Sequence, residues 1–71
     1  MSTKIQQKFD ERFLLFCENK NNQLLDLHKL TGQYLGKYSI DITGDYRAIF
    51  EHVGDDSVQF LRIGTHNQLY K

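Results

Sequence analysis

The most constraining feature of the sequence is a series of three short strand patterns separated by two tight turns, between residues 37 and 64. Residues 37–42 alternate polar and apolar side chains, as a half-buried strand does. Residues 46–53 and 58–64 form the second and third patterns, and the turns at 43–45 and 54–57 are rich in Gly, Asp and Ser. Because such short turns join antiparallel neighbours, this region predicts a three-stranded antiparallel sheet.

A helix is predicted before the sheet, from about Lys4 to Glu18. Apolar residues recur there at steps of three and four, as they do on one face of a helix: Ile5, Phe9, Phe13, Phe16 and Cys17. Thr3 and Gln6 have the spacing of an N-terminal capping box. The asparagine-rich segment 19–22 ends the helix, since Asn competes for backbone hydrogen bonds. We expect the apolar stripe, Cys17 included, to lie in the core.

Residues 23–32 connect the helix to the sheet. They hold four leucines that are too closely spaced for a one-sided strand and too short a run for a helix, so we interpret them as an irregular anchored connector. The whole chain has 71 residues, of which 39% are apolar, which is enough for one modest core. The sequence therefore predicts a single α+β domain over residues 1–71, with the helix packed on one face of the sheet.

The register of the first hairpin determines which face carries Arg47. A three-residue loop at 43–45 pairs Ile42 with Tyr46 and places Asp41 and Arg47 together on the face opposite the core. A two-residue loop moves Arg47 to the other face. We favour the longer loop because it leaves the charge in water and Tyr46 in the core.

Composition excludes several classes of protein. Nine Lys and Arg balance nine Asp and Glu, so net charge gives no general attraction to nucleic acid or membrane. One cysteine rules out an internal disulfide framework and fits a reducing compartment. No apolar run reaches membrane-spanning length and no secretory signal is present, so we expect a cytoplasmic protein without membrane partners.

Four residues of the last third suit phosphodiester chemistry: Asp45, Arg47, His66 and Tyr70. All fall near strand ends, where side chains from neighbouring strands converge. Histidine transfers protons near neutral pH, arginine matches the geometry of phosphate, and an aromatic ring offers a surface on which a base stacks. Such a site needs no metal or other cofactor.

The motifs of the chain resemble those of a known family. Residues 28–71 contain HKLTG, GKYSIDI, GDYRAIF and FLRIGTHNQLY, in that order. This order is similar to the RelE/ParE toxin superfamily, and within it to the YafQ-like and RelE-like mRNA interferases. The resemblance implies a small RelE-like fold and the toxin of a type II toxin–antitoxin system. Such a toxin is a ribosome-dependent endoribonuclease that cuts mRNA and is neutralised by a cognate antitoxin.

The resemblance also implies residue roles. His28 and Asp45 match site residues of YafQ-like toxins, and Arg47 matches the arginine that holds the scissile phosphate. His66 matches a histidine with an acid–base role, and Tyr70 the final aromatic that contacts the nucleotide. A further residue, Arg62, is a weaker candidate for contact with RNA.

Two departures from the family pattern favour a second interpretation. Asp41 stands where a histidine or another basic residue is expected, and a carboxylate there repels phosphate unless it is paired. The strand and the first helix that usually begin the family are not evident, which would leave a sheet edge open to homo- or hetero-oligomer formation. The alternative is therefore a truncated, catalytically weak domain that binds an antitoxin.

Each candidate also has a structural interpretation. Arg47 is a suitable cross-strand partner for Asp41, Asp45 is a common turn residue, and Tyr70 can pack on the rim of the sheet. The leucines around His28 are compatible with a buried structural histidine. For His52, which no family motif supports, we expect an ordinary surface role.

Overall fold

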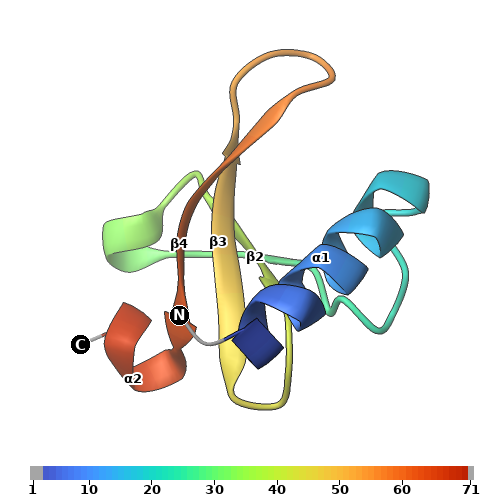
Figure 1. Cartoon of the computed structure of the whole chain (residues 1–71). Coiled ribbons are helices and arrows are strands. Elements are labelled where there is room, and N and C mark those ends of the chain that lie inside the picture. The colour runs from blue at the N-terminus through green and yellow to red at the C-terminus, as the bar shows by residue number, and fades with distance from the viewer. Residues whose placement is uncertain (1–2, 71) are drawn as a thin grey trace.

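One long helix, a four-stranded antiparallel sheet and a short C-terminal helix make up the computed structural model, which describes residues 3–70 (Figure 1). The elements are α1 (Thr3–Glu18), β1 (His28–Lys29), a 3₁₀ helix (Gly32–Tyr34), β2 (Tyr38–Asp41), β3 (Tyr46–His52), β4 (Val58–Thr65) and α2 (His66–Leu69). The strands lie side by side in the order β1-β2-β3-β4. The predicted α+β class, the first helix and the three main strands are confirmed.

The sheet gains a fourth strand from the connector that the sequence marked as irregular. In β1, His28 lies opposite Ser39 and Lys29 opposite Tyr38. The chain reverses between β1 and β2 through Gly32 and Gly36, whose φ angles of 65° and 88° lie in the left-handed region that glycine tolerates. The prediction of only three strands is corrected to four.

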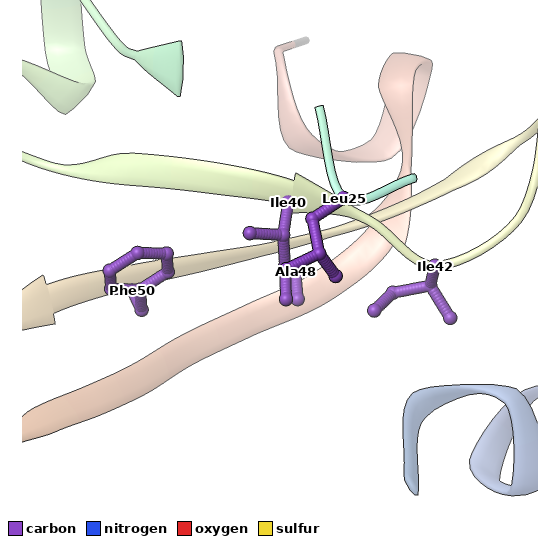
Figure 2. Packing of buried hydrophobic residues seen from close by; sticks show 5 residues of the cluster. All are labelled: Leu25, Ile40, Ile42, Ala48 and Phe50. Atoms are coloured by element: carbon purple, nitrogen blue, oxygen red, sulfur yellow. The ribbon is translucent and has the colours of Figure 1, made fainter. Parts of the chain in front are cut away.

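The main core lies between α1 and the sheet. Figure 2 shows the residues that form its buried centre: Leu25, Ile40, Ile42, Ala48 and Phe50. A second, smaller cluster covers the opposite face of the sheet with Leu30, Tyr34, Ile49 and Leu69. Both faces of β3 are therefore covered, which explains why Ala48, Ile49 and Phe50 are all buried in succession.

Helix α1 lies on the sheet without burying any residue completely. Phe9, Leu15 and Phe16 pack against the main core, whereas Phe13 remains 38% exposed. Cys17 is exposed, so the prediction that it fills the core is wrong. Leu15 and Phe16 face the sheet, and the helical twist then points Cys17 away from it. No helix within residues 3–70 combines the length and apolarity needed to cross a membrane.

Asparagine side chains stabilise the turns that follow α1. The backbone amide of Asn21 donates to Oδ1 of Asn19 at 3.1 Å, and that of Leu24 donates to Oδ1 of Asn22 at 2.9 Å. These bonds replace the hydrogen bonds of a continuing helix. The expected end of the helix at Glu18 is confirmed.

The first hairpin has the three-residue loop that the sequence favoured. The amides of Ile42 and Thr43 both donate to the carbonyl of Tyr46, at 2.9 and 3.2 Å, and Asp41 lies opposite Arg47. Within the loop, Oγ1 of Thr43 accepts hydrogen bonds from the amides of Asp45 and Tyr46. Arg47 therefore belongs to the sheet face opposite α1.

A bulge interrupts the pairing of β4 with β3. Ile49 lies opposite Arg62, but the next residue, Phe50, lies opposite Phe60, so Leu61 has no partner. The extra residue shifts the alternation of side chains between the two faces. As a result Phe60 and Ile63 both pack on the α1 side, while Arg62 is directed to the opposite face.

Replacing Leu25 by alanine is expected to destabilise the domain by about 2–5 kcal/mol, because the side chain is completely buried. Its carbonyl also accepts a 2.7 Å hydrogen bond from the amide of Asp41, which ties the connector to β2. Leu24 is 60% exposed and provides the control, since alanine there is expected to change stability by less than about 0.5 kcal/mol. Urea unfolding of both variants checks the difference, and equal effects would contradict the anchoring role of Leu25.

Candidate functional site

The motif that follows β4 builds a compact C-terminal turn. Thr65 caps α2: its Oγ1 accepts from the amide of Gln68 at 3.3 Å, and Oε1 of Gln68 accepts from the amide of Thr65 at 2.9 Å. A Cβ at Gly64 would lie 2.8 Å from the same Oε1, so glycine leaves the space that the Gln68 side chain occupies. This reciprocal capping box starts the helix immediately after the strand.

Side chains from elsewhere in the chain fix the other end of α2. The hydroxyl of Tyr34 donates to the carbonyl of Leu69 at 2.7 Å and accepts from Nη1 of Arg62 at 2.8 Å. Nη2 of Arg62 donates to the carbonyl of Gln68 at 3.4 Å. Leu69 itself is buried in the second cluster. The four-residue helix is therefore held by capping, by one apolar anchor and by these hydrogen bonds.

An open hollow of about 400 Å³ lies beside α2, and its lining includes four of the residues predicted from the sequence: His28, Arg47, His66 and Tyr70. Lys29, Leu30 and Thr31 complete the lining. An adjoining hollow of about 520 Å³ is lined by Asp45, Tyr46 and Thr65 among others, and it shares Arg47 and His66 with the first. The predicted residues other than Arg62 therefore gather around Arg47 and His66.

Arg47 forms an ion pair with Asp41 across the first hairpin. Its Nε lies 3.3 Å from Oδ1 of Asp41, and both side chains are about 30% exposed (27% and 30%). Oδ1 is nevertheless buried and accepts no hydrogen bond from the described residues, so the contact is electrostatic rather than a well-directed bond. The carboxylate approaches Nε, and Nη1 and Nη2 donate no hydrogen bond to any of residues 3–70. Those two nitrogens remain available for an anion.

The imidazole rings of His28 and His66 differ in their hydrogen bonding. Nδ1 of His28 lies 2.8 Å from the carbonyl of Asp26, and because a carbonyl only accepts, Nδ1 carries the proton. Nε2 shares a 3.1 Å hydrogen bond with the hydroxyl of the buried Ser39. The exposed ring of His66 makes no hydrogen bond to any described residue and stacks at 43° on Tyr70, with ring centroids 4.6 Å apart. His66 is therefore the histidine whose ring nitrogens are open to a ligand.

Two of the predicted site residues, Asp45 and Arg62, lie outside the hollow that His28, Arg47, His66 and Tyr70 line. Asp45 is exposed in the hairpin loop, and its carboxylate contacts no basic side chain within residues 3–70. Arg62 lines neither of the two hollows around His66 and instead binds Tyr34 and the carbonyl of Gln68. Its contact with RNA stays a prediction.

Sequence reasoning did not identify the residues that support the site. Tyr34, Ser39 and Gln68 hold α2 and His28 in place, yet none was a candidate. The spacing of Thr65 and Gln68 is itself a capping-box signal and would have revealed α2. Tyr34 and Ser39 carry no such local signal, because their partners lie far along the chain.

The chemistry available at this surface is that of an anion site. Arg47 and Lys29 supply positive charge, His66 can donate or accept a proton, and the Tyr70 ring offers an apolar face. Among the residues that the structure describes, no group of three or more His, Cys, Asp or Glu side chains is arranged to hold a metal ion.

Two solved structures share the fold of this chain. The structure of YafQ from E. coli strain BL21(DE3) superimposes with a TM-score of 0.78 at 20% identity, covering 93% of this chain and 74% of that one. The YoeB/ParE toxin from Agrobacterium tumefaciens gives a TM-score of 0.71 at 17% identity, covering 93% of this chain and 78% of that one. No family model and no curated protein matches the sequence. The RelE/YafQ-like fold expected from the motifs is thus confirmed.

Proposed function

We propose that this chain, whose fold is that of YafQ and the YoeB/ParE toxin, is the toxin of a type II toxin–antitoxin system and a ribosome-dependent mRNA endoribonuclease. The observation that carries the proposal is the gathering of Arg47, His66 and Tyr70 around one hollow on the face opposite α1. A cation that stabilises phosphoryl charge, a proton carrier and a ring on which a base can stack all suit RNA cleavage.

The reaction is an attack of a ribose 2′-hydroxyl on the adjacent phosphorus. The 2′-oxygen loses its proton and forms a bond to phosphorus, while the bond to the 5′-oxygen breaks and that oxygen receives a proton. The products are a 2′,3′-cyclic phosphate and a free 5′-hydroxyl. Two proton transfers and stabilisation of charge on the phosphoryl oxygens are needed.

The side chains divide these roles. Nη1 and Nη2 of Arg47 stabilise the phosphoryl oxygens, since only Nε faces Asp41. His66 transfers one proton through its open ring nitrogens. The second proton transfer is assigned to Asp45, which lines the adjoining hollow together with Arg47 and His66. Tyr70 stacks on a base. His28 shapes the hollow while both its nitrogens bond to Asp26 and Ser39.

The surroundings of the site suggest its partners. The chain has no net charge, and its hollow is open and small, so it lacks the extended basic surface that holds free RNA. The ribosome would hold the mRNA in place of such a surface. Because the protein would then act on ribosomes, we expect it in the cytoplasm. An antitoxin would keep the toxin inactive until it is released.

A second function is favoured by one observation, the ion pair between Asp41 and Arg47. A carboxylate beside the phosphate-binding guanidinium weakens its attraction for an anion. In that case the domain would cleave RNA poorly and would act by binding an antitoxin. The two functions make opposite predictions for cell growth.

Induced expression of the chain is expected to stop growth and to leave mRNAs cut inside translated codons. Purified protein should cut mRNA on ribosomes far faster than the same RNA alone. Mapping of 5′ ends with and without translation inhibitors measures both effects, and the Arg47→Ala variant serves as the inactive control. Normal growth with confirmed soluble expression would reject the nuclease and favour the binding domain.

A further inference from the structure

We propose that Arg62 and Tyr34 are positioning residues: through a hydrogen-bond chain they fix α2, and with it the orientation of the His66–Tyr70 pair. The catalytic consequence of this inference rests on the proposed function, but its structural part does not. Neither residue lines the hollow beside α2. The proposal replaces the contact with RNA that the sequence suggested for Arg62.

Helix α2 is too short to be stable by itself. A helix of four residues has no regular ladder of backbone hydrogen bonds, and the carbonyls at its end lack partners within the helix. Here the carbonyl of Gln68 accepts from Arg62, and that of Leu69 accepts from Tyr34 at 2.7 Å and more weakly from Nε2 of Gln33 at 3.4 Å. The charged guanidinium also donates to the Tyr34 hydroxyl, which strengthens the bond from that hydroxyl to Leu69.

Tyr34 also contacts the aromatic pair directly. The ring of Tyr34, which is only 9% exposed, meets the ring of Tyr70 edge-on with centroids 5.6 Å apart. Tyr70 in turn lies 4.6 Å from the ring of His66. One buried side chain therefore controls both the backbone of α2 and the position of the ring that stacks on His66.

The apolar anchor and the hydrogen bonds have different effects on α2. Leu69 is buried against the sheet and keeps α2 near it, but an apolar contact does not fix the rotation of so short a helix. The hydrogen bonds are directional and do. Because a displacement of about 1 Å in a reacting group can cost about 10²-fold in rate, loss of the chain is expected to matter without unfolding the domain.

Tyr34→Phe tests the proposal, since it removes the hydroxyl and keeps the ring. Tyr38→Phe is the matched control: Tyr38 packs on Phe50 and His52 at the other face, and its hydroxyl bonds to no residue in the described part of the chain. In NMR spectra the parent should show a contact between the rings of His66 and Tyr70. We expect Tyr34→Phe to lose that contact and Tyr38→Phe to keep it.

Ribosome-bound cleavage provides the second readout. Tyr34→Phe should lower kcat about 10- to 100-fold while the pH profile keeps its shape, because the proton carrier is still present but misplaced. Arg62→Gln should have a smaller effect, since the hydroxyl of Tyr34 can still donate to Leu69. The double variant should be slower than Tyr34→Phe alone, but by less than the effect of Arg62→Gln in the parent, because Arg62 acts partly through Tyr34 and partly through its own bond to Gln68.

The outcomes distinguish the two proposals. A parent that does not cleave rejects the proposed function, and the NMR contact still tests the positioning role. If Tyr34→Phe keeps both the ring contact and the parental rate, the positioning role is wrong. Strictly additive effects of Arg62→Gln and Tyr34→Phe would also overturn it, because they would mean that the two residues act independently.

Discussion

Replacing Arg47 by alanine is expected to lower the rate of RNA cleavage about 10²–10³-fold, the usual cost of removing one donor that stabilises charge in the transition state. Lys29 is the other basic residue in the lining of the hollow, and it projects from the edge strand β1 rather than from β3, which carries Arg47. The reduction should be similar at every pH, because a guanidinium does not change charge over the working range. Single-turnover cleavage on ribosomes measures it.

Arg47→Ala needs a control because Arg47 is ion-paired with Asp41. Removing Arg47 leaves the buried Oδ1 of Asp41 without its nearby cation, which costs stability as well as activity. The double variant Arg47→Ala/Asp41→Asn removes that charge and separates the two effects. Arg47→Lys keeps the charge but loses the planar fork, and it should recover only part of the rate. Parental cleavage by a folded Arg47→Ala variant would contradict the phosphate-binding role.

Replacing His66 by glutamine is expected to lower the rate about 10²–10⁴-fold, as loss of one acid–base group does. Magnitude does not separate this effect from that of Arg47, but the pH profile does. If His66 transfers a proton, the limb of the profile due to imidazole ionisation should disappear in His66→Gln and persist in Arg47→Ala. Cleavage rates from pH 5 to 9, measured on variants with parental unfolding curves, provide the comparison.

His52 provides the matched control for His66. It is also exposed and also contacts aromatic rings, meeting Tyr38 edge-on at 5.2 Å and Phe50 edge-on at 6.0 Å, but on the α1 side of the sheet. His52→Gln should therefore leave both rate and pH profile unchanged. A folded His66→Gln variant with the parental rate and pH profile would show that His66 is structural and that the GTH motif does not carry the proton transfer.

The sheet could be predicted from sequence because its pattern is local. Alternation in residues 37–42 and turn residues at 43–45 fix the first hairpin, and the placement of Arg47 opposite Asp41 follows from the parity of the loop. Strand β1 could not be predicted in this way. It has two residues, too few for any periodicity, and it exists because His28 and Lys29 meet Ser39 and Tyr38 after a reversal of the chain.

The helix shows where a pattern becomes ambiguous. Residues 13–17 are all apolar, so several faces of α1 are equally suitable for the core. Packing selects Phe9, Leu15 and Phe16, while Arg12 reaches the carbonyl of Ile42 at 3.3 Å, and Cys17 is left exposed. Periodicity identifies a helix here but not its buried face.

In the candidate site, the residues proposed to act on RNA could be predicted from the sequence, whereas the residues that support them could not. His66, Arg47 and Tyr70 were found from their motifs, and the structure brings them to one hollow. Their support could not be found, because the hydroxyl of Tyr34 bonds to a carbonyl 35 residues away and Ser39 reaches His28 across 11 residues. Long-range hydrogen bonds of this kind leave no periodic trace in a sequence.

The bulge at Leu61 determines how another molecule can use the free edge of β4. A regular edge offers a continuous row of amides and carbonyls on which a strand of another chain can extend. Here the unpaired residue bends the strand and divides the edge into the segments 58–60 and 62–65. A partner strand must therefore either carry a matching irregularity or pair with one segment alone. Such an edge is compatible with selective binding of one partner strand of matching shape. It is not compatible with unlimited edge-to-edge association of identical sheets.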